Sequence, residues 1–108
     1  MKILSFVLLA FMMVGCATAP VQTYRPRNYD GPMWNIQAKQ SKLGLIDSTY
    51  EILINGEKVI EGKFSDFQKN AEFTGLYQDH NISASFTRIS DHELQIIVFV
   101  DGERAATF

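Results

Sequence analysis

The chain has 108 residues, 46% of them hydrophobic and 20% charged, and its formal net charge is −2. This length suits one small domain near the lower limit for a self-sufficient core. The 10 lysine and arginine residues are spread along the chain, whereas a nucleic-acid surface needs them clustered, so we expect no nucleic-acid partner.

The N-terminus carries a short apolar segment, residues 3–14, directly after Lys2. A helix that crosses the hydrocarbon core of a bilayer needs about 20 apolar residues, so this segment is too short. One basic residue followed by a short apolar run is typical of a secretory signal peptide. We therefore predict that residues 1–15 are a signal peptide that is removed from the mature protein.

That segment ends at the only cysteine of the chain, in the sequence Met13-Val14-Gly15-Cys16. These residues resemble the lipobox of bacterial lipoproteins, in which a large apolar residue and two small ones precede the modified cysteine. Leucine is usual at the first of these positions, where this chain has Met13. The resemblance implies that the Cys16 sulfur carries a diacylglycerol as a thioether and that its freed α-amino group carries a further acyl chain. Two or three acyl chains anchor a protein firmly, whereas one binds a membrane only marginally.

The alternative is cleavage by an ordinary signal peptidase after Ala17-Thr18-Ala19, which has small residues at alternate positions. That cut would place Pro20 directly after the broken bond, where its missing N–H and restricted backbone make a poor substrate. We therefore favour lipidation of Cys16. In a two-membrane cell, alanine after the cysteine implies by the same resemblance transfer to the outer membrane, with the domain facing the periplasm.

Residues 16–33 form the predicted tether between the lipid anchor and the folded domain. They contain Pro20 and Pro26, few aliphatic side chains and no sustained alternation, which is typical of an extended linker. Arg25 and Arg27, each close to a tyrosine, could form a small interaction motif, but we favour a solvated linker.

A period-two pattern begins at Trp34 and indicates β-strands. The first predicted strand, residues 34–39, alternates apolar with polar side chains, and a loop is predicted over residues 41–47. The next apolar face, in residues 50–54, ends at Asn55-Gly56. This dipeptide between two β-prone runs is the strongest short signal for a type I′ hairpin turn.

The return strand of that hairpin is predicted over residues 57–64, and residues 65–69 form a connection with room for one helical turn. A second hairpin follows, with one apolar face in residues 70–77 and another in residues 82–87. Residues 78–81 are predicted to turn the chain between them.

Residues 94–100 are apolar on both faces for much of their length, so we predict a central strand that is covered on both sides. Asp101-Gly102 repeats the hairpin signal, and residues 103–108 close the chain. The sequences around the two turns, INGEK and VDGER, are alike. This likeness indicates either a decayed duplication or the same turn chemistry used twice, and we favour the second interpretation.

These patterns together predict an all-β domain over residues 34–108, a small antiparallel meander of six or seven strands. Turn signals recur at about 8–12 residues and almost no segment is helical, which is typical of a sandwich or a partly open barrel. With Cys16 acylated, no thiol remains for a disulfide, so packing alone must hold the domain.

Few residues could carry chemistry. Asp79-His80 and Asp91-His92 could in number bind zinc, but the predicted strand between them separates them by roughly 25 Å. Metal ligands must lie within about 2 Å of one ion. The chain has neither a free thiol nor a known catalytic motif, so we predict no catalytic, metal-binding or cofactor-binding residue.

Two further sets of polar residues are interpreted as parts of strand surfaces. Ser83 and Ser85 alternate with core residues, which is typical of the solvent face of a sheet. Glu57 and Glu61 form a carboxylate pair, but nothing nearby would desolvate it as a general acid requires.

Trp34 and Tyr29 lie near the tether and could form an exposed binding patch, although we favour Trp34 as the plug of a small core. We predict a non-enzymatic lipoprotein that binds or scaffolds an unidentified envelope protein through a sheet face, a loop end or an edge strand. The alternative is an inhibitor or assembly accessory protein. Small anchored β domains of similar outline include lysozyme inhibitors and pilotin-like proteins, and that resemblance is one of architecture only.

Overall fold

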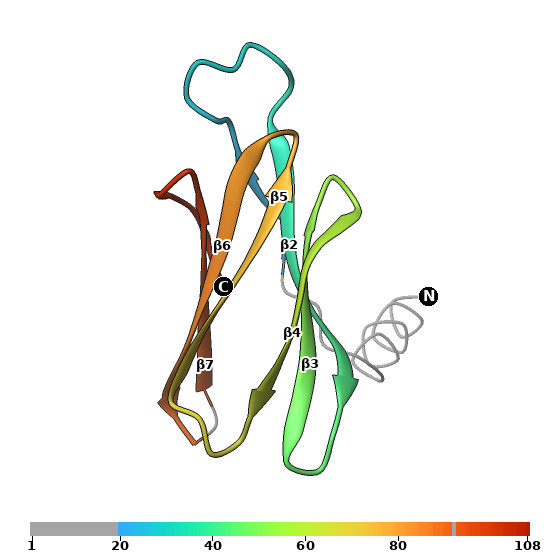
Figure 1. The fold of residues 1–108 in the computed structure, drawn as a ribbon, viewed down its shortest axis with the longest axis vertical. Helices are drawn as coiled ribbons and strands as arrows, with labels where there is room; N and C mark the ends of the chain where they lie inside the picture. Colours follow the sequence, from blue (N-terminus) through green and yellow to red (C-terminus); the bar gives the residue numbers. More distant parts are fainter. Residues whose placement is uncertain (1–19, 92) are drawn as a thin grey trace, which may run out of the picture.

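The computed structural model describes residues 20–91 and 93–108. In this part of the chain the strands form two four-stranded antiparallel sheets that pack face to face (Figure 1). The predicted all-β class is confirmed, and the architecture is a sandwich. The eight strands, more than the six or seven predicted, are β1 (Gln22–Tyr24), β2 (Trp34–Leu43), β3 (Asp47–Ile54), β4 (Glu57–Ser65), β5 (Asn70–Tyr77), β6 (His80–Ser90), β7 (Glu93–Val100) and β8 (Glu103–Thr107).

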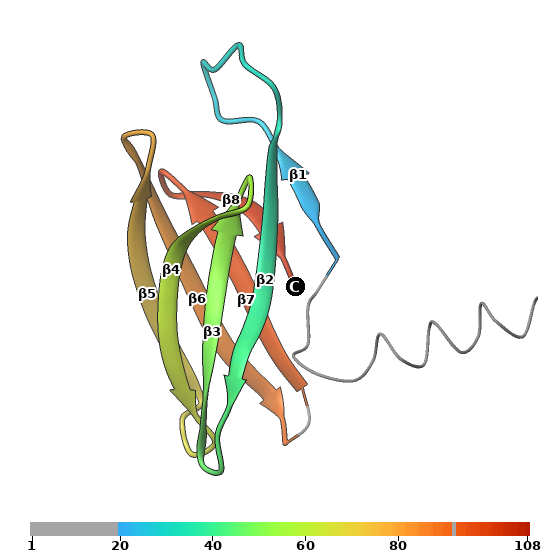
Figure 2. The same cartoon turned by 90° about the vertical axis from the view of Figure 1, so that its right-hand side faces the viewer.

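Each sheet is a simple meander (Figure 2). The first sheet has the order β1-β2-β3-β4 and the second has the order β5-β6-β7-β8. The connection from β4 to β5 carries the chain from one sheet to the other. Every neighbouring pair is antiparallel, as the short predicted connections require.

The meander sorts the connections between two ends of the sandwich (Figure 1). At one end, called here the turn end, the tight turns β3–β4, β5–β6 and β7–β8 lie together with the loop of residues 25–33. At the other end, called the loop end, lie the connections β2–β3, β4–β5 and β6–β7. Segments far apart in the sequence therefore meet at each end.

The two predicted Asx-Gly turns are both present as two-residue hairpin turns. φ is 53° at Asn55 and 83° at Gly56, and it is 51° at Asp101 and 84° at Gly102. A type I′ turn requires a positive φ at both central residues, and asparagine, aspartate and glycine are the residues that adopt it most readily. The β5–β6 connection is equally tight, and its central residues also have positive φ.

The segment predicted as tether contributes a strand. β1 lies within residues 16–33 and pairs with the start of β2, with Gln22 opposite Ile36 and Tyr24 opposite Trp34. A strand of three residues is too short to show a period-two pattern, so no sequence pattern predicts it. The folded domain begins at Gln22 and not at Trp34.

Two predicted connections are also built differently. β2 continues to Leu43, so the loop predicted over residues 41–47 shrinks to residues 44–46. Residues 65–69 contain no helical turn. They form an irregular turn in which the Ser65 N–H donates to the Gln68 side chain at 2.8 Å.

The core lies between the sheets and is centred on Phe86 of β6. Its ring lies 5.4 Å from the Tyr50 ring, 5.7 Å from the Phe64 ring and 5.3 Å from the Phe73 ring. These partners come from β3, β4 and β5, so one side chain joins both sheets. Aromatic contacts of this kind add to the apolar area that folding removes from water.

Trp34 closes the core at the turn end, which confirms its interpretation as a plug. Its side chain is fully buried. Its ring makes edge-to-face contacts with Tyr29, Tyr77 and His80 at centroid distances of 5.9, 5.0 and 5.2 Å. Trp34 is therefore not available as an exposed binding residue.

β7 lies between β6 and β8, which confirms the predicted central strand. The prediction that both of its faces are covered is wrong. Ile96, Val98 and Val100 face inward and are buried, whereas Ile97 and Phe99 on the outer face are only partly buried. The outer face has no third layer within the described chain, so its apolar residues are shielded only by neighbours in the same sheet.

Candidate functional site

The predicted lipid site lies outside the described residues. This applies to the signal peptide, the lipobox and Cys16 itself. Lipidation of Cys16 therefore stays a prediction. The described part of the chain contains no helix long and apolar enough to span a bilayer.

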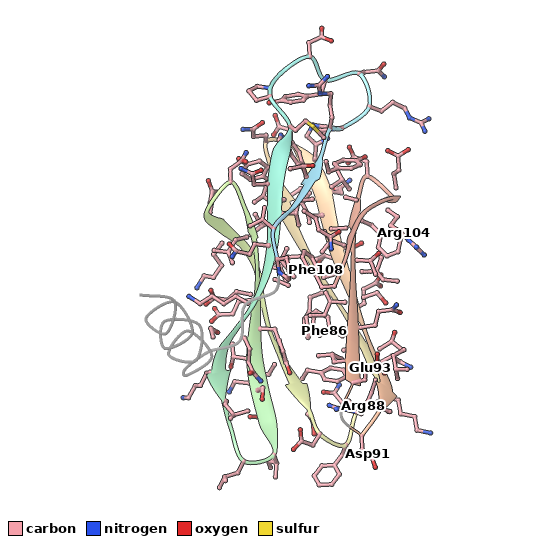
Figure 3. The ribbon with its side chains drawn as sticks, turned by 180° about the vertical axis from the view of Figure 1, so that it is seen from behind. Phe86, Arg88, Asp91, Glu93, Arg104 and Phe108 are labelled. Atoms are coloured by element: carbon pink, nitrogen blue, oxygen red, sulfur yellow. The ribbon has the colours of Figure 1, made fainter. Side chains whose placement is uncertain are left out.

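The two Asp-His dipeptides lie at opposite ends of the sandwich. Asp79 and His80 belong to the β5–β6 turn at the turn end, and Asp91 lies in the β6–β7 connection at the loop end (Figure 3). The predicted separation is thus confirmed for these three residues, while His92 lies outside the described residues. Among residues 20–91 and 93–108, no three His, Cys, Asp or Glu side chains lie close enough to hold a metal ion.

Ser83 and Ser85 lie on the outer face of the second sheet. In β6, Ser83 is opposite Thr74 and Phe99, and Ser85 is opposite Glu72 and Ile97. Neither serine has a histidine opposite it. Their place on a strand surface agrees with the structural interpretation.

A polar network joins the end of β1 and the loop after it to the β7–β8 turn at the turn end. The Tyr24 hydroxyl donates to Glu103 at 2.5 Å, and the Arg27 guanidinium donates to the same carboxylate at 2.7 Å. Burial and the hydrogen bond to Glu103 raise the pKa of Tyr24 to about 12. The hydrogen bond from Tyr24 and the nearby Arg27 charge lower the pKa of Glu103.

This network lines a surface pocket of about 360 Å³. Its walls come from residues on β1, the loop after it and the β7–β8 turn: Tyr24, Pro26, Arg27, Val100, Asp101, Gly102 and Glu103. Each charged side chain of the network already has an opposite partner, which is typical of a structural contact between two segments. The pocket therefore offers no unpaired acid or base for catalysis.

His80 also has a carboxylate partner, but that partner is not Asp79. His80 Nδ1 lies 2.6 Å from Asp101 Oδ2, and the Asn81 N–H donates to Asp101 Oδ1 at 2.9 Å. These two interactions lower the pKa of Asp101. The pair fastens the β5–β6 turn to the β7–β8 turn.

One side of the sandwich is open along its lower half, towards the loop end. β1 pairs only with residues 34–36 of the ten-residue β2. On the facing sheet, β8 pairs with β7 only as far as Ile97, and Phe108 extends this pairing by its backbone bonds with Ile96. Below these short strands, the edges of β2 and β7 face each other without a covering strand from the described chain.

The gap between these edges is an apolar groove of about 250 Å³, which we call the edge groove. Its lining residues come from β2, β3, β7 and the C-terminus: Ala38, Lys39, Gln40, Tyr50, Leu94, Ile96 and Phe108. Figure 3 shows Phe86 and Phe108 in the space between the two sheets. The groove thus combines an apolar floor with a free strand edge along residues 37–40.

In the upper half of the same side, the Gln22 side chain adds a second link between β1 and β8, beside the Tyr24–Glu103 hydrogen bond. The Gln22 amide accepts a hydrogen bond from the Thr107 N–H at 3.0 Å and donates to the Thr107 carbonyl. It therefore links β1 to β8 as a backbone strand pair would. The opposite side of the sandwich is closed, because β4 and β5 approach each other at Gly75, where an added Cβ would lie 2.5 Å from the Val59 carbonyl.

The edge groove was not predicted from sequence. Its existence depends on the length difference between β1 and β2, and β1 itself has no sequence pattern that reveals it. Of the three predicted modes of binding, an edge strand is the one that this geometry favours.

Comparison with protein-family models, with curated protein sequences and with solved structures gives no match for this chain.

Proposed function

We propose that the protein is a non-enzymatic lipoprotein, anchored to the outer membrane by Cys16 and facing the periplasm, that binds an extended segment of an envelope protein. The bound segment would add as a strand to the free edge of β2. Its apolar side chains would enter the edge groove. No cofactor or metal takes part in this function.

The open edge of β2 beside an apolar groove is the observation that supports this proposal. In β-strand addition, backbone hydrogen bonds supply affinity and pockets for alternate side chains supply specificity. Residues 37–40 can supply the backbone hydrogen bonds, because β1 pairs with β2 only as far as Ile36. The groove between Tyr50, Leu94 and Phe108 can supply the pocket for the side chains of the bound segment.

The absence of an enzymatic role is supported by how the titratable groups are used. Asp101 is held by His80 and a backbone N–H, while Glu103 is held by Tyr24 and Arg27. General acid–base catalysis needs a group positioned to exchange a proton with a substrate. These five side chains instead contact one another in two sets, Asp101 with His80 and Glu103 with Tyr24 and Arg27.

Site-specific photo-crosslinking tests the proposal in living cells. A photoreactive phenylalanine analogue is placed at Lys39 on the free edge, at Leu94 in the groove, and at Glu61 on the exposed surface of β4 as the control. We expect one envelope protein to be captured from Lys39 and Leu94 and not from Glu61. The same experiment in a Cys16→Ser background, with palmitate labelling to score lipidation, tests whether capture requires the anchor.

Equal capture from all three positions, or none from the groove in correctly folded protein, would contradict binding at this edge. Capture of this chain's own N-terminal segment would show instead that residues before β1 occupy the groove. Equal palmitate labelling of wild type and Cys16→Ser would remove the anchor from the proposal.

An inhibitor remains the second candidate, supported by the loop of residues 25–33. This loop extends beyond the tight turns at the turn end (Figures 1 and 2). The Arg27–Glu103 ion pair at 2.7 Å and the Tyr29–Trp34 ring contact hold it against the sandwich. A held, projecting loop can enter an enzyme cleft. An inhibitor would protect cell-wall substrate from added lysozyme, and Arg27→Ala would weaken that protection.

A further inference from the structure

The loop end of the sandwich carries an exposed apolar surface. Eight large apolar side chains are exposed in the described chain, and five of them lie in or beside the three loop-end connections. They are Leu43 (77% exposed), Leu45 (99%), Ile46 (60%), Phe67 (83%) and Ile89 (54%). We call this set the apolar tips. Scattered single apolar residues are normal on a surface, but a group confined to one end marks an interaction site.

The turn end differs sharply in its chemistry. Its turns are made of Asn55-Gly56, Gln78-Asp79 and Asp101-Gly102. Two exposed large apolar side chains of the described chain lie near this end, Leu76 at 68% beside the β5–β6 turn and Met33 at 46% in the loop of residues 25–33. Both ends belong to the same two sheets, so the difference comes from the residues placed in their connections.

The course of β1 brings the chain to the domain from the direction of the loop end. β2 runs from Trp34 at the turn end to Leu43 at the loop end, and β1 is antiparallel to it. The backbone that precedes Gln22 therefore arrives from the side of the apolar tips. Gln22 lies level with Ile36.

The length of the preceding chain matches the remaining length of the sandwich. Cys16 lies six residues before Gln22 (22 − 16), which is about 20 Å of extended chain at roughly 3.3 Å per residue. From Ile36 to Leu43, the pairing strand β3 also advances six residues, from Ile54 to Ser48 (54 − 48), or about 20 Å. An extended tether thus has the length to bring Cys16 level with the apolar tips.

From the direction of β1 and the length of the chain that precedes it, we propose that the apolar tips are seated on the bilayer beside the acyl chains of Cys16. The proposal deepens the function proposed above and rests on its lipid anchor. In it, the loop end lies in the boundary between headgroups and acyl chains, where apolar side chains of peripheral proteins bury roughly 5–10 Å deep. The edge groove then opens sideways just above the membrane, and the loop of residues 25–33 points away from it.

Charge does not drive this seating. The ionisable side chains in and next to the loop-end connections include two lysines and four carboxylates: Lys42, Asp47, Asp66, Lys69, Asp91 and Glu93. Arg88 is turned to the protein, because its guanidinium donates to the carbonyls of Gln68 and Ser65 at 3.2 Å. Binding therefore depends on apolar area, and neither anionic lipid nor low salt should strengthen it.

Quenching of tryptophan fluorescence by brominated lipid tests the proposal. The full-length lipidated protein is reconstituted into neutral phosphatidylcholine vesicles that contain the brominated lipid, and mass spectrometry verifies the lipid on Cys16. The test variant is Phe67→Trp, and the matched control is Leu76→Trp, which alters an exposed apolar residue near the turn end. Buried Trp34 is common to both variants, so the wild type supplies its signal for subtraction.

We expect bromolipid to quench the Phe67→Trp emission at least twofold more than the Leu76→Trp emission, with a blue shift only in the former. Equal quenching of the two variants in verified lipidated protein would overturn the seating and leave the anchor standing. A blue shift of Phe67→Trp without bromolipid quenching would overturn it too, because a protein partner or a second copy would then cover the tips. A mature chain without lipid on Cys16 would overturn the anchor, and the seating with it.

Discussion

Asn55 and Asp101 occupy equivalent positions in the two sheets, 46 residues apart (101 − 55). Each is the first residue of a two-residue turn and has a φ near +50°. The Asn55 N–H donates to the Asn35 carbonyl, and the Asp101 N–H donates to the Asn81 carbonyl, both at 2.8 Å. In return, the Asn35 N–H donates to Asn55 Oδ1 and the Asn81 N–H donates to Asp101 Oδ1, at 3.0 and 2.9 Å.

The same interval of 46 residues relates other features of the two sheets. The β3–β4 register shifts between Ile52 and Leu53, and the β7–β8 register shifts between Val98 and Phe99. Ile36 opposite Ile54 corresponds to Ile82 opposite Val100. These features lie within three residues of Asn55 and Asp101, so they belong to the two hairpin turns and the residues that flank them. The likeness of the two sequences around the turns therefore extends to their strand pairing.

Asn55→Ala should lower the free energy of unfolding by about 1–2 kcal/mol. The variant loses the hydrogen bond from the Asn35 N–H and places alanine at a positive φ, where Cβ crowds the backbone. Asn55→Asp is the control, because the aspartate at position 101 accepts the equivalent hydrogen bond from the Asn81 N–H. Urea denaturation followed by circular dichroism measures both. Equal losses in the two variants would contradict a role for the side-chain oxygen.

Ionisation of Tyr24 should make the protein less stable at alkaline pH. The folded pKa of Tyr24 is raised to about 12 from an ordinary value of 10.0, so folding holds the proton more tightly than the unfolded chain does. The resulting stability is complete below pH 10 and is lost as the pH rises to about 12. Absorbance at about 295 nm should show a late tyrosinate transition from Tyr24, and Tyr24→Phe should remove it. A transition unchanged in Tyr24→Phe would contradict this assignment.

Acid should weaken the attachment between the β5–β6 and β7–β8 turns. Hydrogen bonds from His80 and from the Asn81 N–H lower the folded pKa of Asp101 below its ordinary value of 3.8. Stability from this carboxylate is present above that ordinary value and is lost as the pH falls through the folded pKa. Asp101→Asn keeps the acceptor oxygen but cannot titrate. Its stability should depend less on pH below about pH 4 than that of the wild type, measured by thermal unfolding.

Gln22→Ala should weaken the contact between β1 and β8, which the Tyr24–Glu103 hydrogen bond continues to join. The variant loses both side-chain hydrogen bonds to the Thr107 backbone, and at about 0.5–1.5 kcal/mol per bond the expected loss is about 1–3 kcal/mol. Amide hydrogen exchange should accelerate in β1 and β8 and stay unchanged in β3. Thr23→Ala, at an exposed position of the same strand, is the control. Uniform acceleration across the domain would mean global destabilisation and would contradict a local role for the Gln22–Thr107 hydrogen bonds.

Gly75→Ala should be destabilising because the two sheets meet closely there. An added Cβ would lie 2.5 Å from the Val59 carbonyl oxygen, which is backbone and cannot rotate away. Overpacking of this kind costs roughly 1–3 kcal/mol. Thr74→Ala on the neighbouring exposed position should change stability by less than about 0.5 kcal/mol. A neutral Gly75→Ala would mean that β4 and β5 separate easily, which would open a second edge of the sandwich.

The sequence by itself determined the features that depend on neighbouring residues. Alternation of apolar and polar side chains is set by the strand period of two, so the all-β class could be predicted from it. The Asn55-Gly56 and Asp101-Gly102 turns could be predicted as well, because a positive φ is a property of individual residues. Lipidation of Cys16 depends on a local motif too, and it remains to be tested.

Only the tertiary structure decided the features that depend on distant segments. Ile97 and Phe99 are as apolar as the core residues beside them, and they are only partly buried because no third layer of the described chain covers them. The edge groove exists because a three-residue β1 lies against a ten-residue β2, opposite a β7 that β8 only partly covers. The apolar tips become one surface because the meander gathers three connections at one end. Strand lengths, sheet pairing and chain direction create these sites, and no local pattern encodes them.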